Sequence, residues 1–401
     1  MFDLLTGVRI LDLTTIVLGP FATQTLGDLG ADVIKIESPS GDLFRAVRPG
    51  RSRHMGAGYL NCNRNKRSLV IDLKADAGRA LMMELTEKAD VLVHNMRPKA
   101  VNRLGLGYER LKTINADLVY CAAPGFGGDG PYADEPAYDD VMQAASGLAA
   151  LNAGAEGEPR FLGTIVCDKV GGLYLAQAVL AGLVRRSRTG KGCYIETPMF
   201  ESMAAFLMVE QMAGRSFRPP LGGTGYDRLL SPHRKPYRTR DGYIALLPYS
   251  TEHWQRFLRF VGRDDLVSAD SVVNPLERSE NIDRLYQVVS ESMPARTTQD
   301  WLSILDDLDI PCSRVNRLDD LFDDPHLKAV GFFREVDHPS EGALLAPRPP
   351  FRTGDVETRP DRPAPDLGAQ YAEVLEEFGI VADRIRALVA AGVVGGGPEA
   401  S

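Results

Sequence analysis

The sequence predicts an α/β protein: a Rossmann-like large domain built on a parallel sheet, joined to a smaller α+β domain. Two observations predict it. The first half of the chain alternates short apolar runs with segments of helical spacing, a pattern typical of a parallel sheet covered by helices. After residue 215 the pattern changes to a stretch rich in Pro and Gly, followed by a hairpin and isolated helices. A chain of 401 residues is long enough for two domains.

The first half contains the strands and helices of the expected large domain. The first helix should begin near Pro20, because proline suits a first helical turn. Gly27 and Gly30 lie towards its end. Strands are expected over 8–13, 32–37, 91–94 and 118–121, and further helices over 76–88 and 108–114.

The second half contains the expected small domain and the return of the chain. Residues 236–247 read as a hairpin that turns at Asp241-Gly242, because this pair tolerates positive φ. Helices are expected over 254–261, 302–308 and, at the end of the chain, 370–390. We expect a large domain over 1–215 completed by 330–401, a small domain over 226–325, and linkers near 216–225 and 326–365.

Composition excludes several classes of protein. The formal net charge of −8 disfavours a general nucleic-acid binder, which needs excess Lys and Arg. The N-terminus lacks a secretory signal pattern, and no apolar run is long enough to predict a membrane span. The five cysteines and six histidines are scattered without metal-ligand spacing. We therefore expect a cytoplasmic protein with reduced thiols, no metal site, and no nucleic-acid or membrane partner.

A dinucleotide site is the first hypothesis for a chain that begins strand–helix–strand. That site needs G-x-G-x-x-G directly after the first strand, so that backbone can approach the pyrophosphate. Here the strand is followed by one glycine, Gly19, and then Pro20, which removes a backbone donor. No GxxxxGK[ST] loop is present either. The sequence therefore disfavours a nicotinamide dehydrogenase.

Asp168 lies at or just before a predicted helix, since apolar residues follow helical spacing from Val170 onward. One interpretation makes it an N-cap, whose carboxylate accepts N–H groups of the first turn. In the other, the helix dipole favours the charged carboxylate, which attacks an activated acyl group. Gly171 and Gly172 would then leave room for a ligand carbonyl. Spacing alone leaves both interpretations open.

The sequence resembles the class III coenzyme A-transferases, the family of formyl-CoA and carnitine CoA-transferases, to which α-methylacyl-CoA racemase is related. The resemblance covers nearly the whole chain and rests on several segments in one order. They are VRILDLTTIVLGP (8–20), LGADVIKIE (29–37), NCNRNKRSLVID (61–72), ADVLVHNMRPKAVNRLG (89–105), AYDDVMQAASG (137–147), Cys167-Asp168, RTGKG (188–192), YRTRDGYI (237–244) and IPCSRV (310–315).

The resemblance implies that Asp168 is the catalytic nucleophile. It also implies a CoA site whose Lys and Arg side chains contact phosphate groups. One departure concerns Ser38, where the family often has arginine; Arg45 or Arg48 could substitute for it. The implied CoA-binding residues are Thr15, Ile16, Val17, Lys66, Arg67, Asn95, Met96, Arg97, Arg103 and Tyr138.

The resemblance further implies a ring-shaped monomer and an interlocked homodimer, with an acyl-CoA thioester and a carboxylic acid as substrates and no permanently bound cofactor. CoA would pass between acids through an aspartyl–acyl anhydride and an aspartyl-CoA thioester. The family closes its site with a mobile glycine loop, and Gly222–Gly225 is the candidate here, although it also reads as a plain linker. The sequence does not name the donor or the acceptor acid.

Tyr138 separates the transferase from the racemase branch. The racemase uses a histidine with the aspartate as a two-base pair, and Tyr138 occupies the place of that histidine. A phenol with a pKa near 10 is a poor base at neutral pH, so the transferase is favoured. The alternatives are a racemase-like enzyme and a CoA-binding protein without activity; an intact Asp168 argues against the second.

Overall fold

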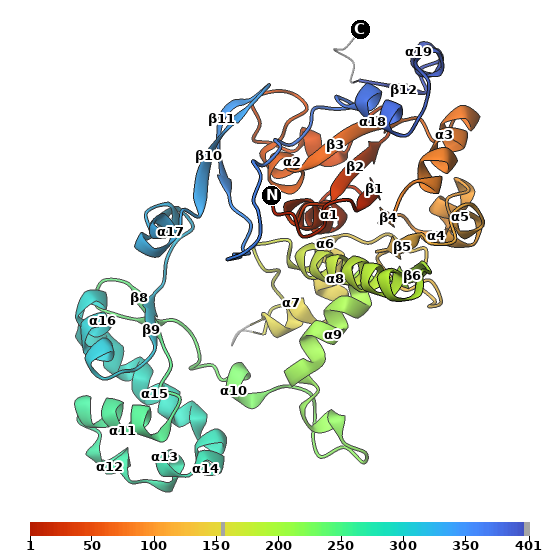
Figure 1. Ribbon diagram of the computed structural model, residues 1–401. Helices are drawn as coiled ribbons and strands as arrows, with labels where there is room; N and C mark the ends of the chain where they lie inside the picture. The colour runs from red at the N-terminus through yellow and green to blue at the C-terminus, as the bar shows by residue number, and fades with distance from the viewer. Residues whose placement is uncertain (154–156, 397–401) are drawn as a thin grey trace. The chain divides into compact units, whose positions relative to one another are not determined.

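The computed structural model describes residues 1–153 and 157–396. The chain forms two compact units. The large unit comprises Met1–Asn152, Pro159–Leu207 and the chain from Gly331 onward, and the small unit contains Met208–Val330. The large unit is therefore discontinuous in sequence, and its final segment returns to the sheet after the small unit is complete (Figure 1).

A seven-stranded sheet forms the centre of the large unit, in the order β12-β3-β2-β1-β4-β5-β6. Every neighbouring pair is parallel except β12 with β3. The strand order reverses between β1 and β4, as in doubly wound nucleotide-binding folds, where ligands bind at this point. The strands are β1 (Arg9–Leu13), β2 (Asp32–Glu37), β3 (Lys66–Ile71), β4 (Val91–His94), β5 (Val119–Ala122), β6 (Cys193–Glu196) and β12 (Val394–Gly395).

Helices cover both faces of this sheet, because alternate strand residues point to opposite sides. Leu11 of β1 packs against the side formed by α3, α5, α18 and α19, whereas Ile10 packs against the side formed by α1, α8 and α9. The helices are α1 (Leu18–Asp28), α2 (Ala57–Cys62), α3 (Asp76–Glu87), α4 (Pro98–Arg103), α5 (Tyr108–Ile114), α6 (Asp139–Ala145), α7 (Leu148–Leu151), α8 (Val166–Thr189), α9 (Met199–Gln211), α18 (Tyr371–Glu377) and α19 (Ala382–Ala390).

Helix α8 has 24 residues and contains an 18-residue window with a mean hydropathy of 1.2, enough to pass for a membrane span by length and composition alone. Half of its apolar window is buried inside the protein, and it packs against α1 and β5. A Cβ on Gly172 would lie 2.7 Å from the carbonyl oxygen of Leu18, so only glycine permits this close packing. We interpret α8 as a core helix. The expectation that Gly171 and Gly172 leave room for a ligand is wrong, because α1 fills that space.

The small unit has its own core around a three-stranded antiparallel sheet. Trp254, Phe257, Tyr286 and Trp301 are buried in it. The expected hairpin is present as β7 (Tyr237–Arg238) and β8 (Tyr243–Leu246), joined by β9 (Cys312–Arg314). The helices are α10 (Asp227–Leu230), α11 (Thr251–Phe260), α12 (Asp264–Val267), α13 (Asp270–Val273), α14 (Pro275–Glu280), α15 (Ile282–Ser292), α16 (Thr298–Asp307) and α17 (Pro325–Ala329).

The structure differs from the sequence-based expectation in the C-terminal part. The segment expected as a linker over 326–365 contains α17 and an antiparallel hairpin, β10 (Phe333–His338) with β11 (Gly342–Pro347). The single helix expected over 370–390 is two helices, because Gly379 adopts a φ of 80° between α18 and α19. Strands β3, β6 and β12 were not expected. Strand β3 begins with two cationic residues, so its sequence does not show the apolar run that predicts a buried strand.

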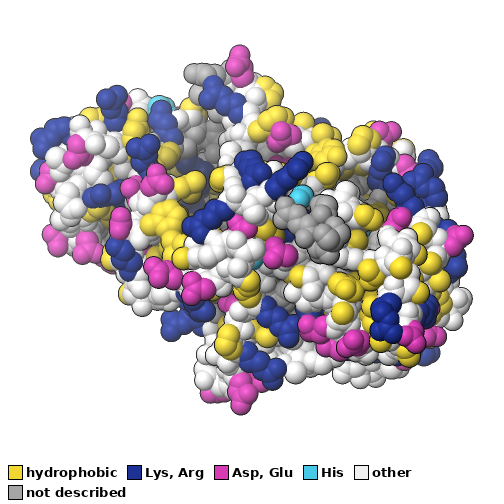
Figure 2. All heavy atoms as spheres, turned by 90° about the horizontal axis from the view of Figure 1, so that it is seen from above, with side chains coloured by type: hydrophobic (Ala, Val, Ile, Leu, Met, Phe, Trp, Pro, Cys, Tyr) yellow, Lys and Arg dark blue, Asp and Glu magenta, His cyan; other side chains and the backbone are white. Residues whose placement is uncertain are grey.

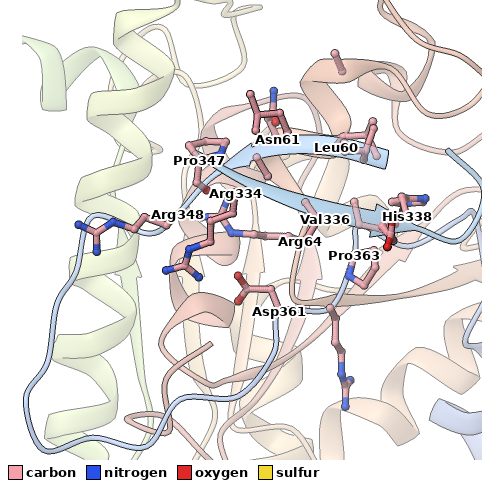
Figure 3. A pocket seen from close by; sticks show the side chains of 17 residues that line it. Leu60, Asn61, Arg64, Arg334, Val336, His338, Pro347, Arg348, Asp361 and Pro363 are labelled. Carbon is pink, nitrogen blue, oxygen red and sulfur yellow. Dashed lines mark hydrogen bonds between the residues drawn. The ribbon is translucent and has the colours of Figure 1, made fainter. Parts of the chain in front are cut away.

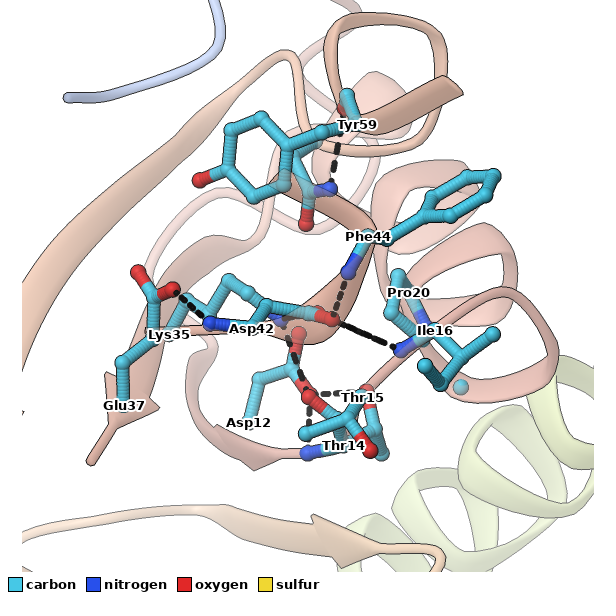
Figure 4. Close-up of polar contacts among 12 residues, drawn as sticks. Asp12, Thr14, Thr15, Ile16, Pro20, Lys35, Glu37, Asp42, Phe44 and Tyr59 are labelled. Atoms are coloured by element: carbon cyan, nitrogen blue, oxygen red, sulfur yellow. Dashed lines mark hydrogen bonds and ion pairs between the residues drawn. The ribbon is translucent and has the colours of Figure 1, made fainter. Parts of the chain in front are cut away.

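A buried network of charges fixes the loop that follows β1 (Figure 4). Lys66 Nζ lies 3.1 Å from Asp12 Oδ2 and donates to the carbonyl of Pro20 as well. Lys35 Nζ lies 2.8 Å from Asp42 Oδ2 and donates to the carbonyl of Thr14. Burial alone would raise the pKa of Asp12, but Lys66, Lys35 and two threonine hydroxyls lower it to about 2. These side chains are therefore ionised partners inside the fold.

The Lys66→Met variant tests this network. Removing one partner of a buried ion pair leaves Asp12 uncompensated, so we expect a loss of about 3–5 kcal/mol in the free energy of unfolding. The exposed Lys74 supplies the control, since Lys74→Met should change stability by less than about 0.5 kcal/mol. Urea denaturation of both variants measures the difference. Equal midpoints would show that Lys66 does not support the fold.

Candidate active site

A cleft of about 340 Å³ opens in the large unit where the strand order reverses. Thr15 and Ile16 come directly after β1, Asn95 to Arg97 come directly after β4, and Asp168 belongs to the start of α8. Parallel strands end at the same edge of a sheet, which is why segments distant in sequence meet here. The remaining lining residues are Leu18, Leu43, Ala100, Ala123, Gly125, Glu135, Pro136, Ala137, Tyr138 and Met199.

Asp168 is the third residue of α8 and is half-buried. The N-cap position is held by Ile165, whose apolar side chain cannot accept a hydrogen bond. Asp139 supplies the cap from α6: its Oδ1 accepts the N–H groups of Cys167 at 2.7 Å and of Asp168 at 3.2 Å. The N-cap interpretation of Asp168 is therefore wrong. Its carboxylate does not cap the helix and lines the cleft instead.

Asp139 was not identified from the sequence. It is buried, and its Oδ2 accepts a hydrogen bond from Gln143 Nε2 at 2.7 Å. Gln143 Oε1 in turn accepts the N–H of Leu162 at 2.8 Å. The pair therefore ties α6 to the chain entering α8. Its position in the AYDD segment was the available signal, but the segment does not show which of Asp139 and Asp140 faces inward.

The environment of Asp168 raises its pKa from 3.8 to about 7, first through burial and second through the charge of Asp139. This direction is opposite to the one that the helix dipole was expected to give. A carboxylate with a raised pKa is a stronger nucleophile once it is ionised. The adjacent Cys167 is not a competitor, because it is buried and its thiol pKa is raised to about 12 by burial and by the neighbouring carboxylates.

The rim formed by residues 14–17 is held rigidly. Asn95 Oδ1 accepts the N–H of Thr15 at 3.1 Å, and Asn95 Nδ2 donates to the carbonyl of Thr15 at 3.0 Å. Ile16 has a φ of 70°, which is rare for a β-branched residue, and its N–H is bound by Asp42 Oδ1 at 3.0 Å. Val17 is buried and lies behind this rim rather than on the cleft wall.

The second rim, Asn95 to Arg97, depends on His94. The N–H of Met96 donates to His94 Nδ1 at 3.1 Å, so His94 Nε2 carries the proton and donates to the Tyr120 hydroxyl at 2.8 Å. Tyr120 then donates to the carbonyl of Leu106. Burial lowers the pKa of His94 to about 4, so the ring is neutral and acts as a support for the rim.

Three expected CoA-binding cations lie outside the cleft. Lys66 is fully buried and its Nζ contacts Asp12, Pro20, Thr23 and Asn63. Arg67 is 4% exposed and pairs with Asp32, Glu373 and Glu377. We assign both to the fold and withdraw them from the binding set, because their donors are already bound. Arg103 is exposed in the last turn of α4.

Arg45 cannot replace the arginine expected at Ser38. Its guanidinium is buried, pairs with Glu37 at 2.7 Å and stacks on Tyr59. Arg48 remains the candidate, since it is exposed and its Nη1 donates to the carbonyls of Gly50 and Ser52. In the cleft itself Arg97 is the cation among the lining residues, and its Nη1 donates to the carbonyl of Asp134.

On the face shown in Figure 2, basic and acidic side chains are interspersed, so this face has no large patch of a single charge. Among the described residues, no group of three or more His, Cys, Asp or Glu side chains is placed to hold a metal ion. The cleft lining offers a carboxylate, hydroxyl-bearing and amide side chains and backbone groups.

The sequence model of CoA-transferase family III matches residues 5–371, and the chain belongs to this family. It is a class III CoA-transferase, an enzyme that moves CoA between carboxylic acids. The resemblance read from the sequence is thereby confirmed. Acyl-CoA thioesters are the substrates that membership of this family implies.

Similar proteins match over almost their whole length. Succinyl-CoA:glutarate CoA-transferase of Homo sapiens is 32% identical over 97% of this chain and 90% of its own. Succinate--glutarate CoA-transferase of Agrobacterium fabrum is 32% identical over 93% of this chain and 95% of its own. The crystal structure of Rv3272 from M. tuberculosis has a TM-score of 0.80 at 30% identity, covering 92% of this chain and 98% of that one. The α/β architecture described above is thus that of solved structures of this family.

The pH dependence of turnover tests the environment of Asp168. Only the ionised carboxylate can attack, so kcat/KM should rise with pH through a midpoint near 7, the raised pKa of Asp168. Asp139→Asn removes the neighbouring charge and keeps Oδ1 for the cap, although it loses the hydrogen bond from Gln143 Nε2. It should move the midpoint to lower pH, but burial should still hold the pKa of Asp168 above its ordinary value. Asp140→Asn makes the same charge change at an exposed position and should leave the midpoint in place. A flat profile from pH 5.5 to 8.5 (a span of about three pH units around neutrality) would contradict the assignment.

Proposed function

We propose that this enzyme transfers CoA through covalent intermediates on Asp168. The observation that carries the proposal is the position of its carboxylate. It lies on the wall of the cleft, and Asp139 rather than Asp168 caps α8. A half-buried carboxylate that does not cap α8 and is bordered by the two rims is suited to nucleophilic attack.

The reaction would proceed in four acyl transfers. The Asp168 carboxylate attacks the donor thioester, forming an aspartyl–acyl anhydride and releasing CoA thiolate. The thiolate attacks the aspartyl carbonyl, which gives an aspartyl-CoA thioester and the free donor acid. The acceptor carboxylate then attacks this thioester, restoring the thiolate and forming a second anhydride. Finally the thiolate attacks the acceptor acyl carbon, which releases Asp168 as a carboxylate.

Each of these steps forms a tetrahedral oxyanion that needs N–H donors. The first turn of α8 offers few, because Asp139 takes the N–H groups of Cys167 and Asp168. The start of α1 supports the proposal better: the N–H groups of Leu18 and Gly19 precede the first intrahelical hydrogen bonds, and Leu18 lines the cleft. Water must also be excluded from the anhydrides. A lid function of Gly222–Gly225 stays a prediction.

The acids exchanged are proposed to be short dicarboxylates. Support comes from the human and Agrobacterium fabrum relatives, which are named as succinate–glutarate CoA-transferases and match along almost all of this chain. The volume of the cleft, about 340 Å³, lies at the small end of ligand sites and would take the acyl and pantetheine ends. The nucleotide end of CoA would then lie along the surface, where Arg48 and Arg103 are exposed.

The quaternary structure is also proposed from the family resemblance: two ring-shaped chains interlocked as a homodimer. Interlocked rings cannot separate without partial unfolding, so dilution should not dissociate them. Sedimentation velocity should therefore give the mass of a dimer at every concentration down to nanomolar. A monomer that forms on dilution, at a concentration where activity persists, would contradict the interlocked arrangement.

The variant Asp168→Ala tests the proposed function directly, with succinyl-CoA as donor and glutarate as acceptor. Loss of the nucleophile should reduce kcat by at least about a thousandfold, while the dissociation constant for CoA changes by less than about threefold. Asp140→Ala, which removes an exposed carboxylate from α6, is the matched control and should retain full activity. Wild type incubated with succinyl-CoA should acquire a protein adduct that hydroxylamine cleaves, and the variant should not.

Two outcomes separate the parts of this proposal. Activity of Asp168→Ala within about tenfold of wild type would show that another group is the nucleophile. A wild-type enzyme that prefers monocarboxylates over glutarate would contradict the choice of acids but leave the covalent mechanism in place.

A further inference from the structure

The buried end of the catalytic cleft is formed by two apolar side chains, Leu18 and Met199, which together we call the floor. Leu18 is 2% exposed and Met199 is 6% exposed, whereas Asp168 is half-buried. The four acyl transfers proposed above leave Met199 without a role.

The floor lies within one helical turn of the nucleophile. Gly171 follows Asp168 by three residues on α8, so the two positions share one face of the helix. A Cβ on Gly171 would lie 2.7 Å from Leu18 Cδ1 and 3.7 Å from Met199 Cγ. The two side chains of the floor therefore pack against the face of α8 that carries Asp168.

The loop after β5 fixes the backbone of Met199. The N–H of Met199 donates to the carbonyl of Pro124 at 2.9 Å, and the N–H of Phe200 donates to the carbonyl of Gly125 at 2.9 Å. A Cβ on Gly125 would lie 2.0 Å from the Cβ of Ala137, so this loop is itself packed against another part of the lining. Met199 can therefore adapt to a ligand only through its own side-chain torsions.

The floor rests on packed core. Met203, one turn further along α9, is fully buried and belongs to the same hydrophobic cluster as Leu18 and Met199. A second cavity of about 160 Å³ lies beside the β10–β11 hairpin (Figure 3). Among the described residues, the linings of this cavity and of the cleft share no member, so the cavity does not deepen the cleft.

The floor is suited to hydrocarbon. In the described lining, the charged side chains besides Asp168 are Arg97 and Glu135, and both are exposed. A carboxylate placed on the floor would be buried without a partner, which is costly. We therefore expect the polar parts of a thioester, and any second carboxylate of the acid, at the open side of the cleft.

Attack by Asp168 brings the acyl group close to the floor. Reacting atoms must approach to about 3–3.5 Å, so the acyl carbon is confined beside the carboxylate. The next carbon, the α-carbon of the acid, lies only one covalent bond further away. Leu18 fills the narrow gap between α1 and α8, whereas Met199 makes an ordinary contact there. Met199 is thus the floor residue whose volume can change without separating these helices.

We propose that Met199 determines which acyl groups the enzyme accepts: it admits a CH2 group as the α-carbon and excludes an α-carbon that carries further methyl groups. The inference rests on the proposed attack by Asp168. A methyl group that a filled apolar pocket does not accommodate changes kcat/KM by about 10- to 200-fold. The thioether of Met199 occupies the space that such a methyl group needs.

Succinate and tetramethylsuccinate are a matched pair of acceptors, because both are symmetric and carry the same charge. With glutaryl-CoA as donor, selectivity is the ratio of kcat/KM for succinate to kcat/KM for tetramethylsuccinate. Met199→Ala removes Cγ, Sδ and Cε and should lower this ratio at least about tenfold, mainly by raising kcat/KM for tetramethylsuccinate. The intrinsic reactivities of the acids cancel when enzymes are compared. If wild type turns over propionate faster than succinate, propionate and pivalate form the equivalent pair.

Two control variants separate selectivity from stability. Met203→Ala makes the same change at a buried position outside the described lining of the cleft. It should lose stability as Met199→Ala does, but change the ratio by less than about threefold. Met199→Leu nearly conserves the side-chain volume and should keep the ratio within about threefold of wild type. If Met199→Ala does not fold, Met199→Val removes less volume and decides the question by a smaller shift in the same direction.

A folded Met199→Ala whose ratio stays within about threefold of wild type would overturn the proposal. The same holds if Met203→Ala lowers the ratio as far as Met199→Ala does. The proposed function fails by different results, namely an active Asp168→Ala or a wild type without the hydroxylamine-sensitive adduct. A wild type that forms the adduct and transfers CoA, with a ratio that Met199→Ala leaves unchanged, would reject the role of Met199 alone.

Discussion

The contact between Asp42 and the N–H of Ile16 is the interaction on which the catalytic rim depends. Asp42 is itself bound to Lys35, and Lys35 holds the carbonyl of Thr14. Together they keep a β-branched residue in a left-handed conformation that its own side chain disfavours. Such strain persists only where the surroundings determine it completely. In a dinucleotide site, glycines allow the loop after the first strand to adopt its conformation. In this fold, several buried charges beneath that loop hold its conformation instead.

The same logic applies on the other side of the cleft. Asp139 satisfies the first turn of α8, and this frees the carboxylate of Asp168 from a structural task. Asp139 also lies close enough to raise the pKa of Asp168. The same residue therefore positions the nucleophile and raises its pKa. The neutral His94 performs a similar supporting task beneath Met96. The cleft is therefore assembled from residues held in place by buried polar partners.

Much of the fold followed from the sequence, because strands such as 32–37 and 91–94 are apolar and are separated by helices with clear spacing. The place of the rims also followed, since residues after β1 and β4 must meet at one edge. Strand β3 could not be found this way, because its first two residues are charged and their partners are distant in sequence. The roles of Lys66, Arg67 and Asp139 depend on tertiary partners, which periodicity does not encode.

The discontinuous large unit has a consequence for synthesis on the ribosome. Arg67 emerges early, but two of its three partners, Glu373 and Glu377, and the edge strand β12 are translated after the whole small unit. The small unit can fold as soon as it is made, whereas the nascent sheet waits with Arg67 paired to Asp32 alone and with one edge open. A chain that stops before α18 would expose both, and would present quality-control proteases and chaperones with an unfinished hydrophobic layer.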